Sequence, residues 1–355
     1  MVFKKPAKVG YVPHSPDFEH PGDKRRFAYY ARRRGIPFEI ADPAKSYDLV
    51  VVTQNADLGL WVRHAKSRII FDLPDSYLSV ARTDPKGLLR GLAKYVGGKT
   101  RYLQLDYWKT LQDICRRADA VACSTEAQRR DILPFCRSVH PILDFHMMCE
   151  GTVKQDYARK EVFNLVWEGL PTNLHCFSVI REVLRTLSAR HRLALHLVTN
   201  LDYHRYMGLY GRRHSIDEVR RIFQPAYLYE WSETFLPVIA TACDLAVIPL
   251  PLDNPLACAK PSNKLLLFWR MGVPAVTSAT PAYLATMSEA RLPMACRTED
   301  EWLKMLEHYI ADEQARKDAG QLGRAYVQQH SSEEAALLAW DRLLEAALAS
   351  KATDA

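Results

Sequence analysis

Short apolar runs rich in β-branched residues alternate with amphipathic stretches along the whole chain. The apolar runs predict strands at 8–13, 36–42, 118–125, 193–200, 226–231, 245–250 and 274–278, another carried within 46–57, and strands that run into loops within 67–78 and 161–173. Apolar positions three or four residues apart predict helices at 24–35, 127–136, 175–191, 215–223, 233–242 and 333–349, with another starting near residue 261. Strands that alternate with helices build parallel sheets from βαβ units, so we expect an α/β protein.

The alternation of strands and helices restarts near residue 160, which predicts two domains. We place the first at residues 1–155 and the second at 156–330. A length of 355 residues is sufficient for two domains of ordinary size. Hydrophobic residues make up 48% and charged residues 25% of the chain, as in globular proteins, so each domain can bury a core.

The net charge of +7 is unevenly distributed: residues 1–150 carry +8 and residues 151–355 carry −1. This asymmetry indicates either an anionic partner of the first half or a solvated basic surface. Residues 86–102 combine basic groups with Leu and Tyr, a composition that suits an anionic membrane surface carrying a lipid-linked acceptor. No nucleic-acid-binding module is visible, so we expect no nucleic-acid partner.

The eight cysteines form no C-x-x-C motif, and several lie in apolar segments. We expect free thiols of a reducing cytosol and no disulfide framework or metal site. The N-terminal residues lack the long apolar stretch of a signal peptide, and no run of about 18 apolar residues occurs. A cytoplasmic protein is therefore expected, with membrane association on the cytoplasmic face if residues 86–102 bind lipid.

The segment KPSNK (260–264) crowds four polar side chains into the predicted start of a helix. It follows the strand at 245–250, and ligands of open α/β sheets bind beyond the carboxyl ends of the strands. The unpaired N–H groups and the dipole of the helix favour an anion there, and Lys260 and Lys264 add positive charge. Two interpretations remain open: a phosphate site, or an ordinary helix capped by Ser262 or Asn263 with solvated lysines.

The same segment carries a family resemblance. DLAVIPLPLD (244–253) followed by KPSNKLLLFWRMGVPAVTS (260–278) resembles the donor-side motif of the GT-B glycosyltransferases, especially the family-four-like retaining group. EVFNLVWEGLPTNLHCFSVIREVL (161–184) is similar to the start of the same domain, and RRADAVACSTEAQRRDI (116–132) to a strand-to-helix segment of the first domain.

The resemblance implies a GT-B fold: two facing Rossmann-like domains with parallel sheets and an interdomain cleft, and a last helix (about 331–350) that returns to the first domain. It also implies a hexosyltransferase-like enzyme that moves a sugar from a nucleotide-sugar to an acceptor hydroxyl. We expect a retaining reaction that needs no metal or other cofactor. A glycan or lipid-linked acceptor would place it in bacterial-type surface polysaccharide or glycolipid synthesis.

The donor-binding residues implied by the resemblance are Gly169 and Asn173 near the phosphates, Tyr229 and Trp231 beside the nucleobase, and Lys260, Ser262, Asn263 and Lys264 at the diphosphate. Family members usually carry two glutamates where this chain has Ala259 and Leu267, and the second of them binds the donor ribose. This departure keeps two alternatives open: a catalytically inactive GT-B-like partner or regulator, and a sugar-nucleotide epimerase of the same fold.

Polar residues that follow strands of the first domain are the candidates for the acceptor side. His14, Asp17 and His20 follow the first strand, where they either bind the acceptor or form a polar surface loop; their spacing matches no zinc site. Asp72 and Asp75 follow the strand that starts at residue 67 and are the candidate catalytic residues, binding sugar hydroxyls or orienting the nucleophile.

Overall fold

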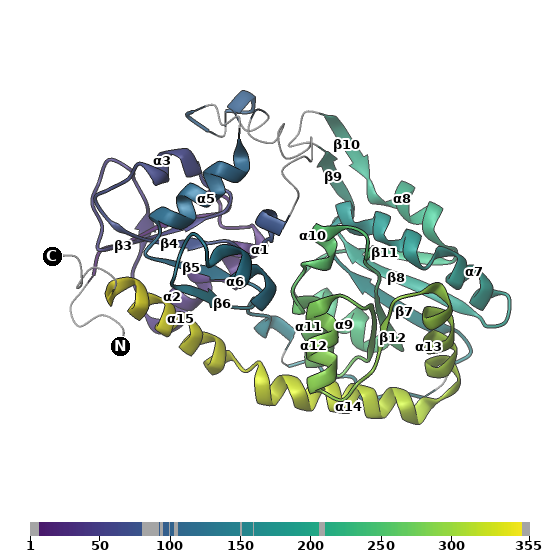
Figure 1. Cartoon of the computed structure of the whole chain (residues 1–355). Coiled ribbons are helices and arrows are strands. Elements are labelled where there is room, and N and C mark those ends of the chain that lie inside the picture. The colour runs from purple at the N-terminus through teal and green to yellow at the C-terminus, as the bar shows by residue number, and fades with distance from the viewer. Residues whose placement is uncertain are drawn as a thin grey trace. The chain divides into compact units, whose positions relative to one another are not determined.

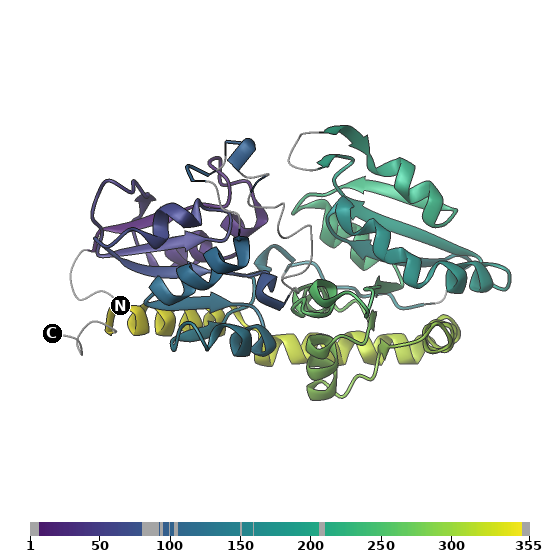
Figure 2. The same ribbon diagram turned by 45° about the horizontal axis from the view of Figure 1, so that its top comes forward.

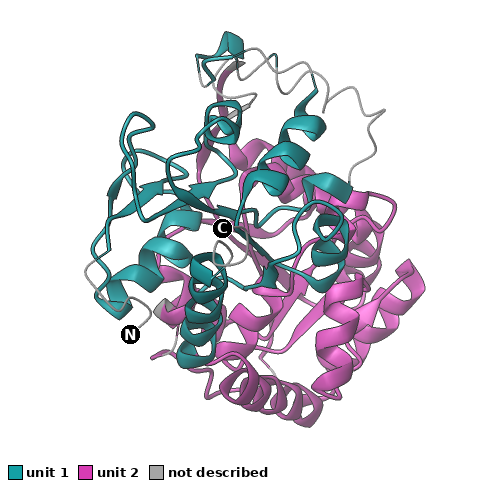
Figure 3. Cartoon of the chain, turned by 60° about the vertical axis from the view of Figure 1, so that its left-hand side comes forward, with its two compact units in different colours: residues 1–145, 333–355 teal, residues 146–332 magenta. Residues whose placement is uncertain are grey.

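The computed structural model describes residues 7–79, 92, 95–98, 100–102, 106–149, 151–158, 160–205 and 210–349. The chain divides into two compact units: unit 1 is Met1–Phe145 with Glu333–Ala355, and unit 2 is His146–Ser332 (Figure 3). The first stretch of unit 1 therefore ends at Phe145, ten residues before the domain boundary that the sequence predicted at residue 155. The Lys154 ammonium donates to the Cys243 carbonyl oxygen at 2.7 Å, which ties this segment to unit 2.

The sheet of unit 1 has six strands that are all parallel, in the order β2-β1-β3-β4-β5-β6 (Figure 1). The strands are β1 (Val9–Val12), β2 (Glu39–Ile40), β3 (Leu49–Thr53), β4 (Arg68–Asp72), β5 (Ala120–Cys123) and β6 (Val139–Pro141). The first five are those predicted from the apolar runs. β3 and β5 are buried along their whole length, which is why they read as continuous β-branched or small apolar runs.

Helices cover both faces of this sheet. They are α1 (Pro21–Arg25), α2 (Phe27–Arg34), α3 (Leu58–Val62), α5 (Tyr107–Arg117), α6 (Glu126–Ile132) and α15 (Glu333–Ala349), with a short 3₁₀ helix η1 (Tyr77–Ser79). α2 and α15 lie along one face, and α3 and α5 along the other (Figures 1 and 2). Trp340 of α15 is fully buried and stacks on Tyr30 of α2, with ring centroids 5.6 Å apart. α15 has the bounds that its amphipathic pattern predicted.

The sheet of unit 2 also has six parallel strands, in the order β11-β8-β7-β12-β13-β14. They are β7 (Phe163–Glu168), β8 (Leu193–Thr199), β11 (Ala226–Glu230), β12 (Leu245–Ile248), β13 (Ala275–Ser278) and β14 (Ala295–Cys296). A separate antiparallel hairpin, β9 (Asp202–Arg205) and β10 (Tyr210–His214), follows β8 and was not predicted.

The helices of unit 2 are α7 (Arg181–Ser188), α8 (Ser215–Ile222), α9 (Phe235–Ala242), α10 (Pro255–Cys258), α11 (Asn263–Arg270), α12 (Pro281–Glu289), α13 (Glu299–Ala311) and α14 (Glu313–His330), with 3₁₀ helices η2 (Met147–Cys149) and η3 (Pro171–Val179). The helix predicted at 175–191 is wrong in its first part, because η3 occupies residues up to Val179. Ile180, with φ of −124°, separates it from α7.

Helix α14 lies against α11 and against the turn after it because two glycines allow close approach. A Cβ atom on Gly320 would collide with the backbone carbonyl oxygen of Gly272, and one on Gly323 would lie 2.6 Å from Trp269 Cγ. Backbone atoms cannot move aside as a flexible side chain does, so a methyl group here must displace the helix.

We therefore expect Gly320→Ala to lower the free energy of unfolding by about 1–3 kcal/mol, the usual cost of overpacking. Urea denaturation of the full chain measures it. Gly211→Ala is the matched control, because nothing lies within 4 Å of the added methyl group there. Equal stability of the two variants would contradict the close contact.

Within the described part of the chain, no helix is both long and apolar enough to cross a membrane. All eight cysteines are free thiols, seven of them buried and Cys258 partly exposed. Most of the basic segment 86–102 lies outside the described residues; its described members Tyr95, Val96 and Tyr102 are exposed.

Candidate functional site

Lys264, in the first turn of α11, reaches the carboxyl end of β7. Its ammonium donates to the backbone carbonyl oxygen of Glu168, the last residue of that strand, and lies 3.2 Å from the Glu168 carboxylate Oε2. The same ammonium lies 5.1 Å from the ring centroid of Trp167, within the range of a cation–π contact. A positive charge is thus fixed at the edge of the sheet where α/β proteins bind ligands.

Gly169 makes this placement possible. A Cβ atom at residue 169 would collide with the Lys264 ammonium and lie 2.7 Å from Trp167 Cζ2. An ammonium group has three N–H donors, and Lys264 uses two of them on Glu168. The side chain remains 24% exposed, so part of it is open to solvent.

A second lysine joins the same two segments. The Lys260 ammonium donates to the Asn173 side-chain oxygen at 3.0 Å, and both residues are partly buried. The structure therefore brings Gly169, Asn173, Lys260 and Lys264 to one edge of the unit 2 sheet.

Ser262 has a different contact from the predicted one. Its hydroxyl lies 2.7 Å from Thr286 Oγ1 and donates to the Ala282 carbonyl oxygen at 3.1 Å, and it makes no capping hydrogen bond to α11. Ser262 is buried and fastens the start of α11 to α12. Asn263 is the first residue of α11 and is partly exposed beside it.

The two aromatic candidates for the nucleobase, Tyr229 and Trp231, make different contacts. The Tyr229 hydroxyl lies 2.9 Å from His196 Nδ1, and His196 Nε2 lies 3.0 Å from Asn164 Oδ1. This chain of contacts runs along the face of the sheet toward the amino end of β7, and burial lowers the pKa of His196. Trp231 follows the carboxyl end of β11, where its backbone N–H donates to the Thr199 carbonyl oxygen at 3.1 Å.

At the two positions where the resembling family usually carries glutamates, this chain has apolar side chains. Leu267 is 1% exposed in the core side of α11, and Ala259 is partly buried at the end of α10. Neither residue offers a group that can bind a ribose hydroxyl.

In unit 1, Asp72 at the end of β4 belongs to a buried ion pair. Arg26 Nη2 donates to Asp72 Oδ1 at 2.7 Å, and Arg26 Nη1 donates to Asp144 at 3.0 Å. The Arg26 and Asp72 side chains are 1% and 0% exposed. Burial opposes the charge on Arg26, but Asp72 and Asp144 outweigh it and raise the pKa of the guanidinium.

His14 lies beside this ion pair with its ring stacked on His20, the centroids 4.7 Å apart. Both nitrogens of its ring are buried, and neither has a hydrogen-bond partner among the described residues. Burial lowers the pKa of His14, although Asp72 acts in the opposite direction. The His20 ring accepts a hydrogen bond from the Gly22 N–H at 3.0 Å, which caps α1.

The remaining acceptor-side candidates are exposed. Asp75 accepts hydrogen bonds from Gln54 Nε2 at 2.6 Å and from the Tyr77 hydroxyl at 3.1 Å. Asp17 accepts from the Glu19 N–H at 3.0 Å in a turn. Asp75 is held in place by two partners and still faces solvent, whereas Asp72 does not.

Sequence reasoning missed Glu168 and Arg26. Glu168 is a polar residue at the end of an apolar strand, a position that can be recognised, but its partner lies 96 residues later. Arg26 sits in a basic run that reads as a solvated helix. Among the described residues, no cluster of three or more His, Cys, Asp and Glu side chains can hold a metal ion.

No protein-family model and no curated protein sequence matches this chain. Solved structures do match. HepE of Anabaena, in complex with UDP-glucose, has a TM-score of 0.59 and 12% identity over 97% of this chain and 100% of its own. Sucrose-phosphate synthase of Thermosynechococcus elongatus has a TM-score of 0.55 and 16% identity over 89% and 75%.

TarM has a TM-score of 0.57 and 11% identity over 83% of this chain, which spans about half of the length of TarM (54%). These likenesses show the fold. The chain has the GT-B fold of the nucleotide-sugar glycosyltransferases, with one six-stranded parallel sheet in each unit, and the predicted fold class is confirmed.

Proposed function

We propose that this chain is a glycosyltransferase that takes a hexosyl group from a nucleotide-sugar bound at the carboxyl edge of the unit 2 sheet. The observation that carries the proposal is the Lys264 ammonium, held beside Gly169 at the end of β7 by a side chain that stays 24% exposed. A diphosphate needs positive charge and N–H donors at this place, and the N-terminal turn of α11 adds its dipole.

The nucleotide we propose is UDP. The similar structure of HepE is a complex with UDP-glucose, and that of a TarM mutant from S. aureus is a complex that includes UDP. Trp231 is the aromatic candidate for the nucleobase, since the Tyr229 hydroxyl is committed to His196. With Leu267 in place of the family glutamate, the ribose contact falls to another residue or to none.

The transfer we propose retains the configuration at the sugar. The acceptor hydroxyl attacks the anomeric carbon on the face that the nucleotide leaves, and its proton passes to the departing phosphate oxygen. Lys264 stabilises the negative charge that develops on that phosphate, so neither a metal ion nor an enzyme base is required. A fixed ammonium supplies this charge without reorganisation during the reaction.

On the acceptor side, we propose that His14, Asp17, His20 and Asp75 bind the acceptor, a glycan or a lipid-linked sugar of surface polysaccharide or glycolipid synthesis. Asp72 is proposed as a positioning residue that holds Arg26. The exposed Tyr95, Val96 and Tyr102 of the basic segment 86–102 support peripheral contact with an anionic membrane at the cytoplasmic face.

A second candidate is a GT-B protein that binds nucleotide but transfers no sugar. It is favoured by Ala259 and by the buried, apolar Leu267, which leave the family's two carboxylates without a replacement at those positions. The two candidates share donor binding and differ in turnover.

Thermal unfolding of the full chain with UDP, GDP, CDP, CMP, ADP and dTDP tests donor binding. We expect UDP to raise the melting temperature selectively, because a ligand at 100 times its Kd adds about 2.7 kcal/mol of stability. No shift with any nucleotide at millimolar concentration would overturn the proposal. A shift with UDP, but no UDP release from any UDP-hexose over a panel of glycan and lipid-linked acceptors, would favour the non-catalytic candidate.

A further inference from the structure

The hairpin β9–β10 is an addition to the sheet of unit 2. It connects β8 to α8, so its base lies at the carboxyl end of β8, on the same sheet edge as Glu168 of the neighbouring β7. The Ser215 hydroxyl donates to the Asn200 carbonyl oxygen at 2.6 Å and closes this base.

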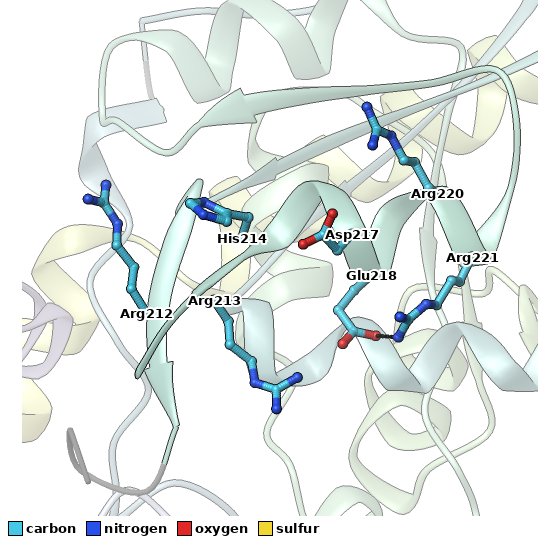
Figure 4. A pocket seen from close by; sticks show the side chains of 7 residues that line it. All are labelled: Arg212, Arg213, His214, Asp217, Glu218, Arg220 and Arg221. Carbon is cyan, nitrogen blue, oxygen red and sulfur yellow. Dashed lines mark ion pairs between the residues drawn. The ribbon is translucent and has the colours of Figure 1, made fainter. Parts of the chain in front are cut away.

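A cavity of about 410 Å³ opens between β10 and α8. Among the described residues, its lining consists of charged or imidazole side chains: Arg212, Arg213, His214, Asp217, Glu218, Arg220 and Arg221 (Figure 4). The described lining thus holds four guanidinium groups and two carboxylates, and these side chains extend in several directions (Figure 4). Its described lining holds no aliphatic or phenyl side chain and a single imidazole, so the cavity favours an anionic group over an acyl chain.

Part of this charge is already compensated. Arg212 and His214 bond to Asp202 at the base of the hairpin, and Arg221 lies 3.7 Å from Glu218. Arg213 and Arg220 have no ion-pair partner among the described residues, and both are exposed. They come from two different elements, β10 and α8, and both line the cavity (Figure 4).

We propose that this basic cavity binds a phosphate or diphosphate group, separate from the donor site. Arginine is the residue best matched to phosphate, because its planar fork donates two parallel hydrogen bonds to the oxygens. The volume greatly exceeds that of one water, about 30 Å³, and accommodates such a group. The group comes either from the headgroup of an anionic lipid or from a soluble phosphorylated compound.

The test compares the full chain with Arg213→Ala/Arg220→Ala. Inorganic pyrophosphate is titrated calorimetrically, both into the otherwise unsubstituted chain and into a Lys264→Ala background, in which the proposed donor site is weakened. In the Lys264→Ala background, we expect the double substitution to raise the Kd for pyrophosphate at least tenfold. In the otherwise unsubstituted chain, we expect it to remove one of two binding events and to leave the donor site. UDP binding is expected to stay unchanged, which separates this site from the donor site.

Arg297→Ala/Lys317→Ala is the matched control, since it removes two exposed positive charges of the same unit away from the cavity. An equal loss in the control, or no effect of Arg213→Ala/Arg220→Ala, would overturn the proposal, as would a chain that binds neither probe. Sedimentation with phosphatidylcholine vesicles, with and without phosphatidylglycerol, identifies the source. Binding to the anionic vesicles that depends on both arginines assigns a lipid headgroup, and binding of pyrophosphate alone assigns a soluble ligand.

Discussion

Lys264→Ala is expected to weaken UDP binding by about 1.5–3 kcal/mol, the value of a charge-assisted contact, which is roughly a ten- to hundredfold rise in Kd. The loss follows from the removal of the ammonium that lies against the backbone at the end of β7. Isothermal titration of UDP into the full chain measures it. A Kd equal to that of the unsubstituted chain would leave KPSNK as an ordinary helix start.

The same substitution also affects stability, because Glu168 is left without its partner while its side chain is only 10% exposed. Stranding a charged group in this way costs about 1–3 kcal/mol. Adding Glu168→Gln to Lys264→Ala is expected to restore much of the stability and none of the affinity, which distinguishes lost binding from partial unfolding. Lys317→Ala, an exposed lysine of the same unit, controls for net charge.

Asp72→Asn is expected to lower the free energy of unfolding by about 3–5 kcal/mol, the usual cost of removing one member of a buried ion pair. The substitution leaves the guanidinium of Arg26, which is 1% exposed, with Asp144 as its remaining carboxylate partner. Urea denaturation, followed by a signal from unit 1, measures the change.

Asp75→Asn provides the comparison for Asp72→Asn, because Asp75 is exposed and its amide replacement keeps the size of the side chain. Its effect on stability should stay within about 1 kcal/mol. If Asp72→Asn unfolds at the same urea concentration as Asp75→Asn, the buried pair does not support the fold, and Asp72 becomes a candidate for direct contact with the acceptor again.

The elements that the sequence predicted are those with a one-sided or continuous apolar pattern. α15 was predicted with the bounds it has, because its apolar residues repeat at helical spacing and Trp340 is fully buried. The hairpin β9–β10 was missed because its sequence has no apolar alternation: its strand residues are mainly His, Arg, Tyr and Asp. The hairpin is defined by the pairing of its two strands and not by a pattern of buried residues.

The proposed donor edge of the unit 2 sheet could be located from the sequence because two local rules point to it. A glycine after a strand and a helix that starts after another strand of the same sheet must meet at the carboxyl edge, and Gly169 and Lys264 do. The ion pairing of Lys264 with Glu168 was not predictable from the sequence. Whether a carboxylate such as Glu168 or Asp72 is exposed, or buried against a cation far away in sequence, depends on packing that local patterns do not encode.

The chain passes from unit 1 to unit 2 after Phe145 and returns to unit 1 at Glu333, and this determines the order in which the two units are completed during translation. Unit 1 needs α15 to cover Phe27 and Tyr30, yet every residue of unit 2 is made before Glu333. On the ribosome, unit 2 can complete its sheet first, while the face of unit 1 that α15 covers is still exposed. Unit 1 is thus translated first and completed last. Until α15 has been made, its aromatic face is exposed and offers a binding site to a nascent-chain chaperone.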